Sequence, residues 1–446
     1  MADVAAPEDL DQVGGRRILG LALPALPVLA AEPLYLLVDT AVVGRLGAVA
    51  LGALAVGAVV LAQVSTQLTF LSYGTTARAA RLHGAGRRTD AVAEGVQASW
   101  LAGGVGIVLL ALVQLVAGPV TRLLAGGGEL AAQAEGWLRI ASLGIPLVLV
   151  TLAGNGWMRG VQDTVRPLRY VLIGNGVSAV VCPVLVLGVG WGLPGSAVAN
   201  VLAQVLSAGL FLRALAVERR AGAVSLRPDP RTIGAHLVLG RDLVLRSLAF
   251  QACFLSAAAV AARSGTAVVA AHQVVLQLWT FTSLVLDSLA VAAQALVGAA
   301  LGAGRTAGAR ALAWRVTRWS AVFAAVIAAG FAAAHSVLPR VFTPDPAVLA
   351  QVPDAWWFLV AVVPVAGVVF ALDGVLLGAG DAAFLRTATL GCAVLGFLPL
   401  IWLSELAGWG LRGIWAGLTA FVVLRMATVV ARVRSDRWVV AGPVRT

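Results

Sequence analysis

The sequence predicts an all-α polytopic membrane protein with twelve transmembrane helices in two six-helix lobes. The first observation is composition: 60% of the 446 residues are hydrophobic and 12% are charged, about half the charged share of a soluble globular protein. The second is that twelve long apolar segments follow one another, most of them near the roughly 20 residues that a spanning helix needs. The third is that the second half of the chain repeats the first.

The repeat has a constant spacing of 218 residues. Gly190–Gly195 reads GWGLPG, and Gly408–Gly413 reads GWGLRG. The same spacing relates Gly156 to Gly374 and Gly160 to Gly378. Because each unit has an even number of spans, both copies have the same orientation, which implies a pseudo-two-fold axis along the membrane normal. The predicted domains are an amino-terminal lobe at 1–216, a cytoplasmic inter-lobe loop at 217–241 and a carboxy-terminal lobe at 242–446.

The net charge of +11 reports topology and not nucleic-acid binding. All 32 basic residues are Arg, and they gather at the ends of apolar segments. With the amino terminus inside, the outer side receives only Arg45, Arg122, Arg139, Arg263, Arg340 and Arg412. The positive-inside rule therefore predicts that both termini are cytoplasmic. Tryptophans near span ends are typical of an aromatic belt: Trp137, Trp157, Trp191, Trp356, Trp357, Trp402 and Trp409.

A carboxylate lies in the middle of the first apolar run. Placing an acid at the centre of a spanning helix costs roughly 2.5–3.5 kcal/mol on insertion scales, so it persists where it is neutralised, paired or functional. Helical spacing places Glu32, Tyr35 and Asp39 on one face. We interpret Asp39 as a proton-coupling site. Pro24 and Pro27 remove backbone donors earlier in this helix and predict a hinge.

The two halves differ at this position. The repeat pairs Asp39 with Ala257 and Glu32 with Phe250. A carboxylate confined to one half suggests that the duplication has diverged in function. The amino-terminal half is therefore the better candidate for an ion site.

Other polar residues within the spans have two interpretations each. Interhelical hydrogen bonds in membranes average about 0.6 kcal/mol, and such bonds explain most single polar residues. Asp287 and Asp373 are deeper acids, either a second proton or cation site or bonds across helices. The first-half candidates for a supporting or substrate cavity are Gln63, Gln67, Asn155, Asn175, Ser178, Cys182 and Asn200; the second-half candidates are Gln277, Asp287, Gln294 and Asp373.

The sequence contains no pattern typical of an enzyme. It has no nucleophile–base pairing or His/Cys metal spacing. The three cysteines all lie inside apolar spans, without the spacing of a metal or redox motif. We therefore expect neither catalysis nor a bound cofactor or metal.

Three stretches resemble the MATE (multidrug and toxic compound extrusion) transporters, and most closely their DinF branch: Glu32–Gly44, Met158–Thr164 and Leu372–Asp381. The resemblance implies a secondary antiporter that exports organic, often cationic and amphipathic, compounds in exchange for protons or sodium by alternating access. The family's first-span acid falls on Asp39 and its bending proline on Pro24. An Asn, an Asp and a Thr that surround the acid in this branch fall on Ser178, Cys182 and Asn200.

The replacement of that second acid by Cys182 favours protons over sodium, because Asp39 loses a second anionic neighbour. We expect a monomer in a bacterial cytoplasmic (inner) membrane that contacts lipid and small organic substrates and needs no cofactor. The alternatives are a sodium-coupled exporter, a flippase of lipid-linked precursors from the same superfamily, and a non-transporting scaffold. A flippase would want a basic, phosphate-binding cavity, and the scarcity of Arg within the spans argues against it.

Overall fold

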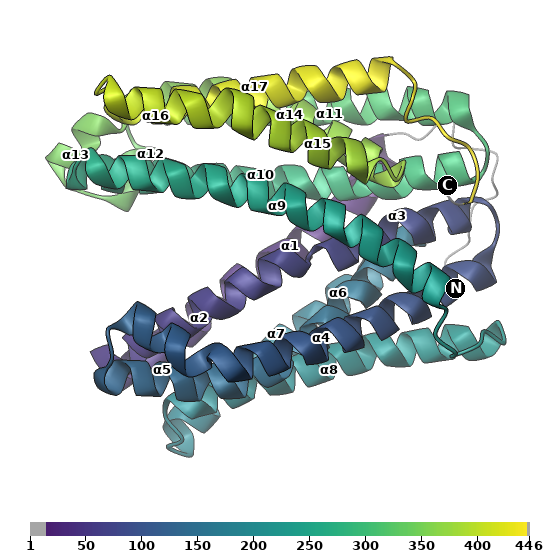
Figure 1. Cartoon of the computed structure of the whole chain (residues 1–446), viewed down its shortest axis with the longest axis horizontal. Coiled ribbons are helices and arrows are strands. Elements are labelled where there is room, and N and C mark those ends of the chain that lie inside the picture. The colour runs from purple at the N-terminus through teal and green to yellow at the C-terminus, as the bar shows by residue number, and fades with distance from the viewer. Residues whose placement is uncertain (1–14, 444–446) are drawn as a thin grey trace. The chain divides into compact units, whose positions relative to one another are not determined.

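The computed structural model describes residues 15–443, except for the side chains of 15–17, 31–35 and 66. The predicted site residues Glu32 and Tyr35 therefore have side chains outside the described part. The regular elements of this range are helices (Figure 1): α1 Gly15–Val43, η2 Gly44–Leu46, α2 Ala48–Leu68, α3 Phe70–Gly84, α4 Arg88–Ala125, α5 Gly128–Ala141, η3 Ser142–Gly144, α6 Ile145–Gly160, α7 Val165–Pro183, η4 Val184–Gly188, α8 Leu193–Ala221, α9 Pro230–Arg263, α10 Thr266–Gly302, α11 Thr306–Ala333, α12 Leu338–Phe342, α13 Pro346–Gln351, α14 Pro353–Gly378, α15 Ala382–Cys392, η5 Ala393–Phe397, α16 Leu398–Leu406 and α17 Gly410–Arg434.

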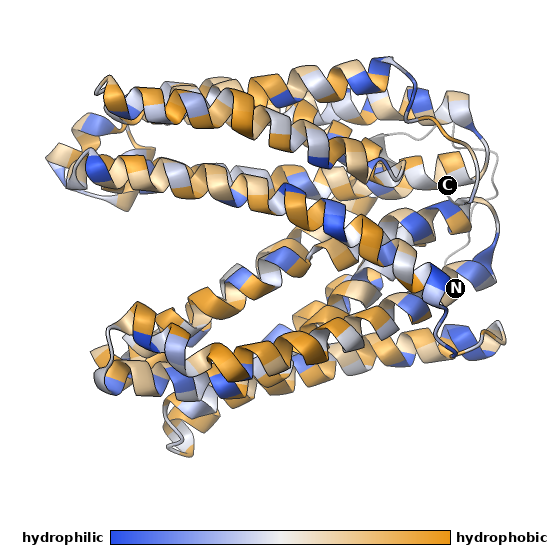
Figure 2. Ribbon diagram, in the orientation of Figure 1, coloured by the Kyte–Doolittle hydropathy of each residue, from blue (hydrophilic) through white to orange (hydrophobic). Residues whose placement is uncertain are grey.

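The helices have the length and composition of membrane spans. Within the described residues, eleven helical segments are long and apolar enough to cross a membrane, and α1 adds the shorter apolar stretch Ile18–Ala30. Apolar residues predominate along these helices (Figure 2). The prediction of an all-helical, polytopic membrane protein is confirmed.

The chain forms two compact units. One contains residues 24–240, and the other contains residues from Arg241 onward together with the start of α1 up to Leu23. The two divisions fall inside α1 and α9, and Leu23 and Arg241 are themselves one repeat spacing apart. The division within α1 coincides with Pro24, one of the two predicted hinge prolines.

The predicted loop at 217–241 is wrong over most of its length. Helix α8 continues to Ala221 and α9 begins at Pro230, so only residues 222–229 are non-helical. Proline is favoured at the first position of a helix, where no backbone donor is needed. Asp229 stabilises this helix start, because its carboxylate accepts hydrogen bonds from the Thr232 hydroxyl at 2.6 Å and from the backbone N–H groups of Arg231 and Thr232. These bonds, led by that of the hydroxyl, lower the pKa of Asp229.

Each unit contains the same close helix crossing. In the first unit α6 packs on α3 so tightly that a Cβ on Gly156 would overlap the Ser72 backbone. In the second unit α14 packs on α10, and a Cβ on Gly374 would overlap the backbone of Ala290. Ser72 and Ala290 are also 218 residues apart. Small residues permit such close approach in membranes, so the repeated glycines keep one architectural role in both halves.

The aromatic-belt prediction is wrong for three tryptophans. Trp137, Trp157 and Trp356 are buried. Trp137 lies well inside α5, because that helix begins at Gly128. Buried apolar residues from α5 and α6 pack around Trp137 in the first unit, and Trp356 and Trp415 belong to the core of the second. The belt prediction remains compatible with four exposed side chains, Trp191, Trp357, Trp402 and Trp409.

Candidate ion-coupling site

Asp39 is a buried carboxylate with neutral partners. Its side chain lies on α1, close to the carboxyl end, and the residue is 1% exposed. Cys182 Sγ of α7 donates to Oδ1 at 3.2 Å, and Ser196 Oγ of α8 donates to Oδ2 at 3.2 Å. Among the described residues no Arg or His forms an ion pair with Asp39. Within the described residues, the three helices therefore meet at a carboxylate that a thiol and a hydroxyl contact.

A third residue orients the Ser196 hydroxyl. Trp137 Nε1 of α5 donates to Ser196 Oγ at 3.0 Å. An indole N–H can only donate, so the Ser196 oxygen accepts this bond while its own O–H donates to the ionised Asp39. A hydroxyl has a second lone pair, and a thiol is both a weak donor and a weak acceptor. Ser196 and Cys182 can therefore each also accept a hydrogen bond from the protonated acid.

The ends of α7 and α8 place these partners. Cys182 directly precedes Pro183, after which the backbone widens into the π-helical turn η4. Gly190 and Gly192 then turn the chain with φ of 78° and 61°, values that a residue with a side chain rarely adopts. Gly195 packs on this turn, since a Cβ there would lie 3.0 Å from the Leu185 carbonyl carbon. The turn brings Ser196 in the first turn of α8 beside the end of α7.

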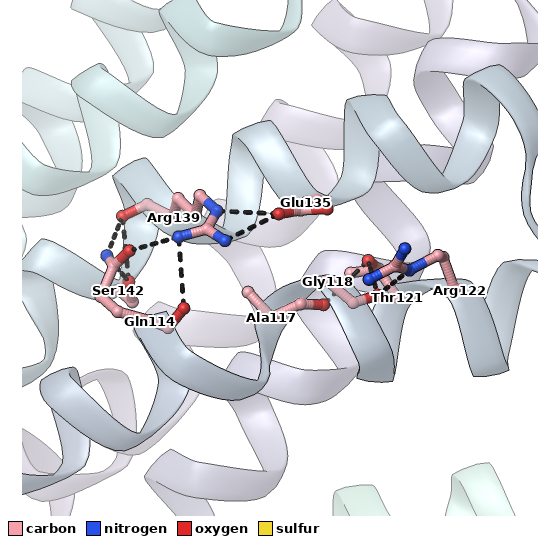
Figure 3. Close-up of polar contacts among 8 residues, drawn as sticks. All are labelled: Gln114, Ala117, Gly118, Thr121, Arg122, Glu135, Arg139 and Ser142. Atoms are coloured by element: carbon pink, nitrogen blue, oxygen red, sulfur yellow. Dashed lines mark hydrogen bonds and ion pairs between the residues drawn. The ribbon is translucent and has the colours of Figure 1, made fainter.

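A polar network between α4 and α5 fixes the helix that carries Trp137 (Figure 3). Gln114 Nε2 donates to the Arg139 carbonyl at 2.7 Å and to Ser142 Oγ at 2.9 Å. Arg139 Nη1 returns a bond to the Gln114 carbonyl at 3.2 Å, and its Nη2 pairs with Glu135 at 2.8 Å. Trp137 lies between Glu135 and Arg139 in sequence. The network therefore restrains α5 where the indole donates to Ser196.

Of the three predicted neighbours of Asp39, one forms a hydrogen bond with it. Cys182 contacts it directly. Ser178 is buried one turn before Cys182, and its hydroxyl has no hydrogen-bond partner within the described residues. Asn200 is half-buried and makes no hydrogen bond to Asp39; the contact from α8 is made by Ser196, one turn earlier. Sequence reasoning missed Ser196 and Trp137, although Ser196 is one helical turn before Asn200 and shares its face.

The remaining first-half candidates form no hydrogen bond with Asp39 in the described part of the chain. Gln63 is exposed, while Gln67 and Asn175 are half-buried. Asn155 is buried, and its Oδ1 has no partner among the described residues. Whether these residues line a substrate path stays a prediction.

The second unit contains a buried acid, Asp373, whose hydrogen-bond partners are charged. Asp373 of α14 is 5% exposed, and its Oδ2 accepts from Arg246 Nη2 of α9 and from Arg425 Nη2 of α17 at 2.6 Å each. Both arginines lie inside spanning helices. An arginine within a span is tolerable beside a carboxylate, so these two residues are exceptions to the predicted scarcity of Arg in the spans. Of the other second-half candidates, Gln277 is exposed, Asp287 is half-buried and Gln294 is buried.

Comparison with known proteins gives consistent matches. The profile of the MatE family matches residues 24–184 and 243–402, two copies whose last residues are one repeat spacing of 218 apart. The DNA damage-inducible protein F of Escherichia coli (strain K12) is 33% identical and aligns over 92% of this chain and 90% of its own length. Protein DETOXIFICATION 44, chloroplastic, of Arabidopsis thaliana is 32% identical, with 92% and 81% covered. A solved structure described as "Crystal structure of MATE in the bent conformation" aligns with a TM-score of 0.88 at 20% identity, covering 97% of this chain and 96% of that one.

Proposed function

This chain belongs to the MatE family of multidrug and toxic compound extrusion transporters, in its DinF branch, and from that premise we propose that it exchanges protons for organic compounds through Asp39. The observation that carries the proposal is a buried carboxylate whose two hydrogen-bond donors among the described residues, Cys182 and Ser196, are neutral. A buried charge without a cationic partner is costly, and adding a proton removes that charge. Asp39 can therefore change its charge without breaking any ion pair in the described part of the chain.

The hydrogen-bond pattern suggests where the proton goes. Ser196 Oγ accepts from Trp137, and within the described residues its own O–H is directed at Oδ2, so we place the added proton on Oδ1. The Cys182 sulfur then turns from donor to acceptor. Proton binding from outside favours one arrangement of α1, which bends at Pro24 or Pro27. Release to the cytoplasm restores an anion that attracts a cationic, amphipathic substrate, so proton and substrate compete for one carboxylate.

The donor set favours protons over sodium. Sodium, like calcium, is a hard cation that prefers several oxygen ligands, whereas a thiol is a soft ligand. In the described residues the Asp39 oxygens are approached by one thiol and one hydroxyl. The same proposal places the monomeric chain in a bacterial cytoplasmic membrane with both termini inside, as the distribution of Arg suggests.

Reconstituted liposomes test the proposal. A fluorescent cationic dye is followed under an imposed proton gradient and then a sodium gradient, for the wild type and Asp39→Asn. Asp90→Asn is the control, because Asp90 is an exposed carboxylate of the same unit that pairs with Arg87. We expect proton-driven dye movement in the wild type and control, and none in Asp39→Asn. Full proton-driven movement in Asp39→Asn would refute the role of Asp39, and movement driven by sodium alone would refute proton coupling.

A further inference from the structure

We propose that a groove between α7 and α8, at their predicted cytoplasmic ends, binds the phosphate of an anionic phospholipid, with Arg213 as the principal ligand. The groove lies within the first unit, and this inference does not depend on the proposed export function. Its volume is about 300 Å³, and the residues that line it are Arg166, Tyr170, Leu210, Arg213, Ala214 and Val217. Two of these described residues are cations and none is an acid.

The two helices that form the groove pack against each other. Arg166 and Tyr170 are one turn apart near the start of α7, and Leu210 and Val217 are two turns apart on one face of α8. The Tyr170 ring packs edge-on against the Phe211 ring of α8, with centroids 5.2 Å apart. The groove is therefore built by the contacts that hold the two helices together.

Arg213 is the arginine of the groove that lacks a partner. It is exposed, and among the described residues it forms no hydrogen bond, ion pair or ring contact. Arg166 instead pairs with Asp163 at 2.6 Å and lies 3.6 Å from Glu218. Arg88 also pairs with Glu218, at 3.1 Å. Two arginines thus balance these two acids, and all five N–H donors of Arg213 remain available for a ligand.

The position of Arg213 favours a lipid over a soluble anion. It lies eight residues before the end of α8 at Ala221, roughly 12 Å along the helix axis. Leu202, eleven residues earlier on the same face, and Ile173 of α7 are 45% and 47% exposed. An arginine on a spanning helix is costly without a counter-ion, and its long side chain extends toward the head groups. A phospholipid offers its phosphate to the guanidinium and its acyl chains to these apolar side chains.

The charge of the groove selects an anionic head group. A guanidinium binds phosphate through two parallel hydrogen bonds. Phosphatidylethanolamine carries an ammonium beside its phosphate, and Arg166 and Arg213 would repel it, whereas phosphatidylglycerol carries a neutral glycerol there. Basic pockets between spanning helices on the cytoplasmic side bind anionic head groups in this way. The distribution of Arg along the chain predicts that this end of α7 and α8 is cytoplasmic.

The second half of the duplication neutralises its arginine within the protein. The repeat pairs Arg213 with Ala431, which is followed by Arg432. Arg432 pairs with Asp381 at 2.8 Å, and its guanidinium lies 4.9 Å from the centroid of the Phe384 ring. At the matching helix end of the second unit the protein therefore supplies the counter-ion. In the first unit the counter-ion of Arg213 has to come from outside.

Native mass spectrometry of the full chain in detergent tests the inference. Phosphatidylglycerol and phosphatidylethanolamine are titrated separately, and the apparent Kd of the first bound lipid is measured for each. We expect the wild type to bind phosphatidylglycerol about tenfold more tightly, the effect of one charge-assisted hydrogen bond. Arg213→Gln should abolish this preference. Arg213→Lys, which keeps the charge but loses the two parallel bonds, should retain part of it.

Further variants separate the site from folding and from general charge attraction. Arg213→Gln breaks no contact among the described residues, so its unfolding temperature without lipid should equal that of the wild type. Val217→Glu places an acid in the groove at a side chain that is 59% exposed, and it should weaken phosphatidylglycerol binding while every arginine remains. Arg169→Gln is the matched control, because Arg169 is an exposed arginine of α7 that does not line the groove. It should leave the preference unchanged.

Three results would overturn the proposal. The first is equal binding of both lipids by the wild type. The second is an equal loss of the preference in Arg169→Gln and Arg213→Gln, because the charge of the whole surface would then attract the lipid. The third is displacement of phosphatidylglycerol by millimolar inorganic phosphate, because the groove would then be a site for a free anion. We expect inorganic phosphate to leave lipid binding unchanged.

Discussion

Asp39 and Asp373 are two buried aspartates on spanning helices with opposite surroundings. Asp39 accepts hydrogen bonds from a thiol and a hydroxyl, and Asp373 accepts them from two guanidinium groups. Neutral donors leave Asp39 able to lose its charge on protonation. Two cations make the charge of Asp373 necessary, because neutralising it would remove the carboxylate that both arginines contact. Partners, and not depth in the membrane, therefore determine what each carboxylate can do.

The largest expected difference between the two acids is in stability. Asp373→Asn removes the carboxylate that the buried Arg425 and the half-buried Arg246 both contact, and it should cost about 3–5 kcal/mol. Asp39→Asn breaks no ion pair among the described residues and should cost about 1 kcal/mol. Thermal unfolding of the purified variants in detergent measures both effects. The comparison fails if the two variants lose the same stability.

A second prediction concerns what the two halves share. Gly156→Ala and Gly374→Ala each add a methyl group where backbone already lies, and overpacking of this kind costs about 1–3 kcal/mol. Because the crossing is repeated, the two losses should be similar. Gly176→Ala and Gly391→Ala are controls, as a Cβ at either position has nothing within 4 Å. A large loss in one half only would show that the crossing has different roles in the two lobes.

Sequence predicts the shared features better than the distinctive ones. Apolar runs and the 218-residue spacing predict the helices, because span length and duplication are local or periodic properties. Asp39 is predictable since a lone acid in an apolar run is conspicuous. Ser196 was missed in favour of Asn200, because both lie on one face of α8 and only the turn at Gly190–Gly195 determines which is level with Asp39. The cluster around Asp373 joins residues 127 and 52 positions apart, and no periodicity connects them.

A smaller effect is expected when Ser196, the hydroxyl donor to Asp39, loses its hydrogen bond from Trp137. Trp137→Phe keeps the ring in its core but removes the N–H that orients Ser196, a change worth about 1 kcal/mol. The Ser196 hydroxyl then loses the hydrogen bond that orients it toward Oδ2, so the ionised form of Asp39 is stabilised less. The pH at which proton-driven dye movement is half-maximal should shift, while dye binding without a gradient stays the same. Trp191→Phe, at an exposed tryptophan, controls for the loss of an indole; an unchanged pH profile in Trp137→Phe would contradict the oriented chain.

The smallest effect is expected at Cys182, where two substitutions distinguish a side chain that can both donate and accept a hydrogen bond from one that can do neither. Cys182→Ser replaces the thiol by a hydroxyl, which also donates and accepts, so proton-driven transport should persist with a rate within a few-fold of the wild type. Cys182→Ala removes both abilities and leaves Oδ1 of a buried acid without its partner, a loss of about 1–3 kcal/mol in one protonation state. We therefore expect the alanine variant to shift the pH profile of transport more than the serine variant. If the alanine and serine variants have the same pH profile, Cys182 contributes only to packing and takes no part in proton binding. Protonated Asp39 would then have Ser196 as its only hydrogen-bonding partner among the described residues.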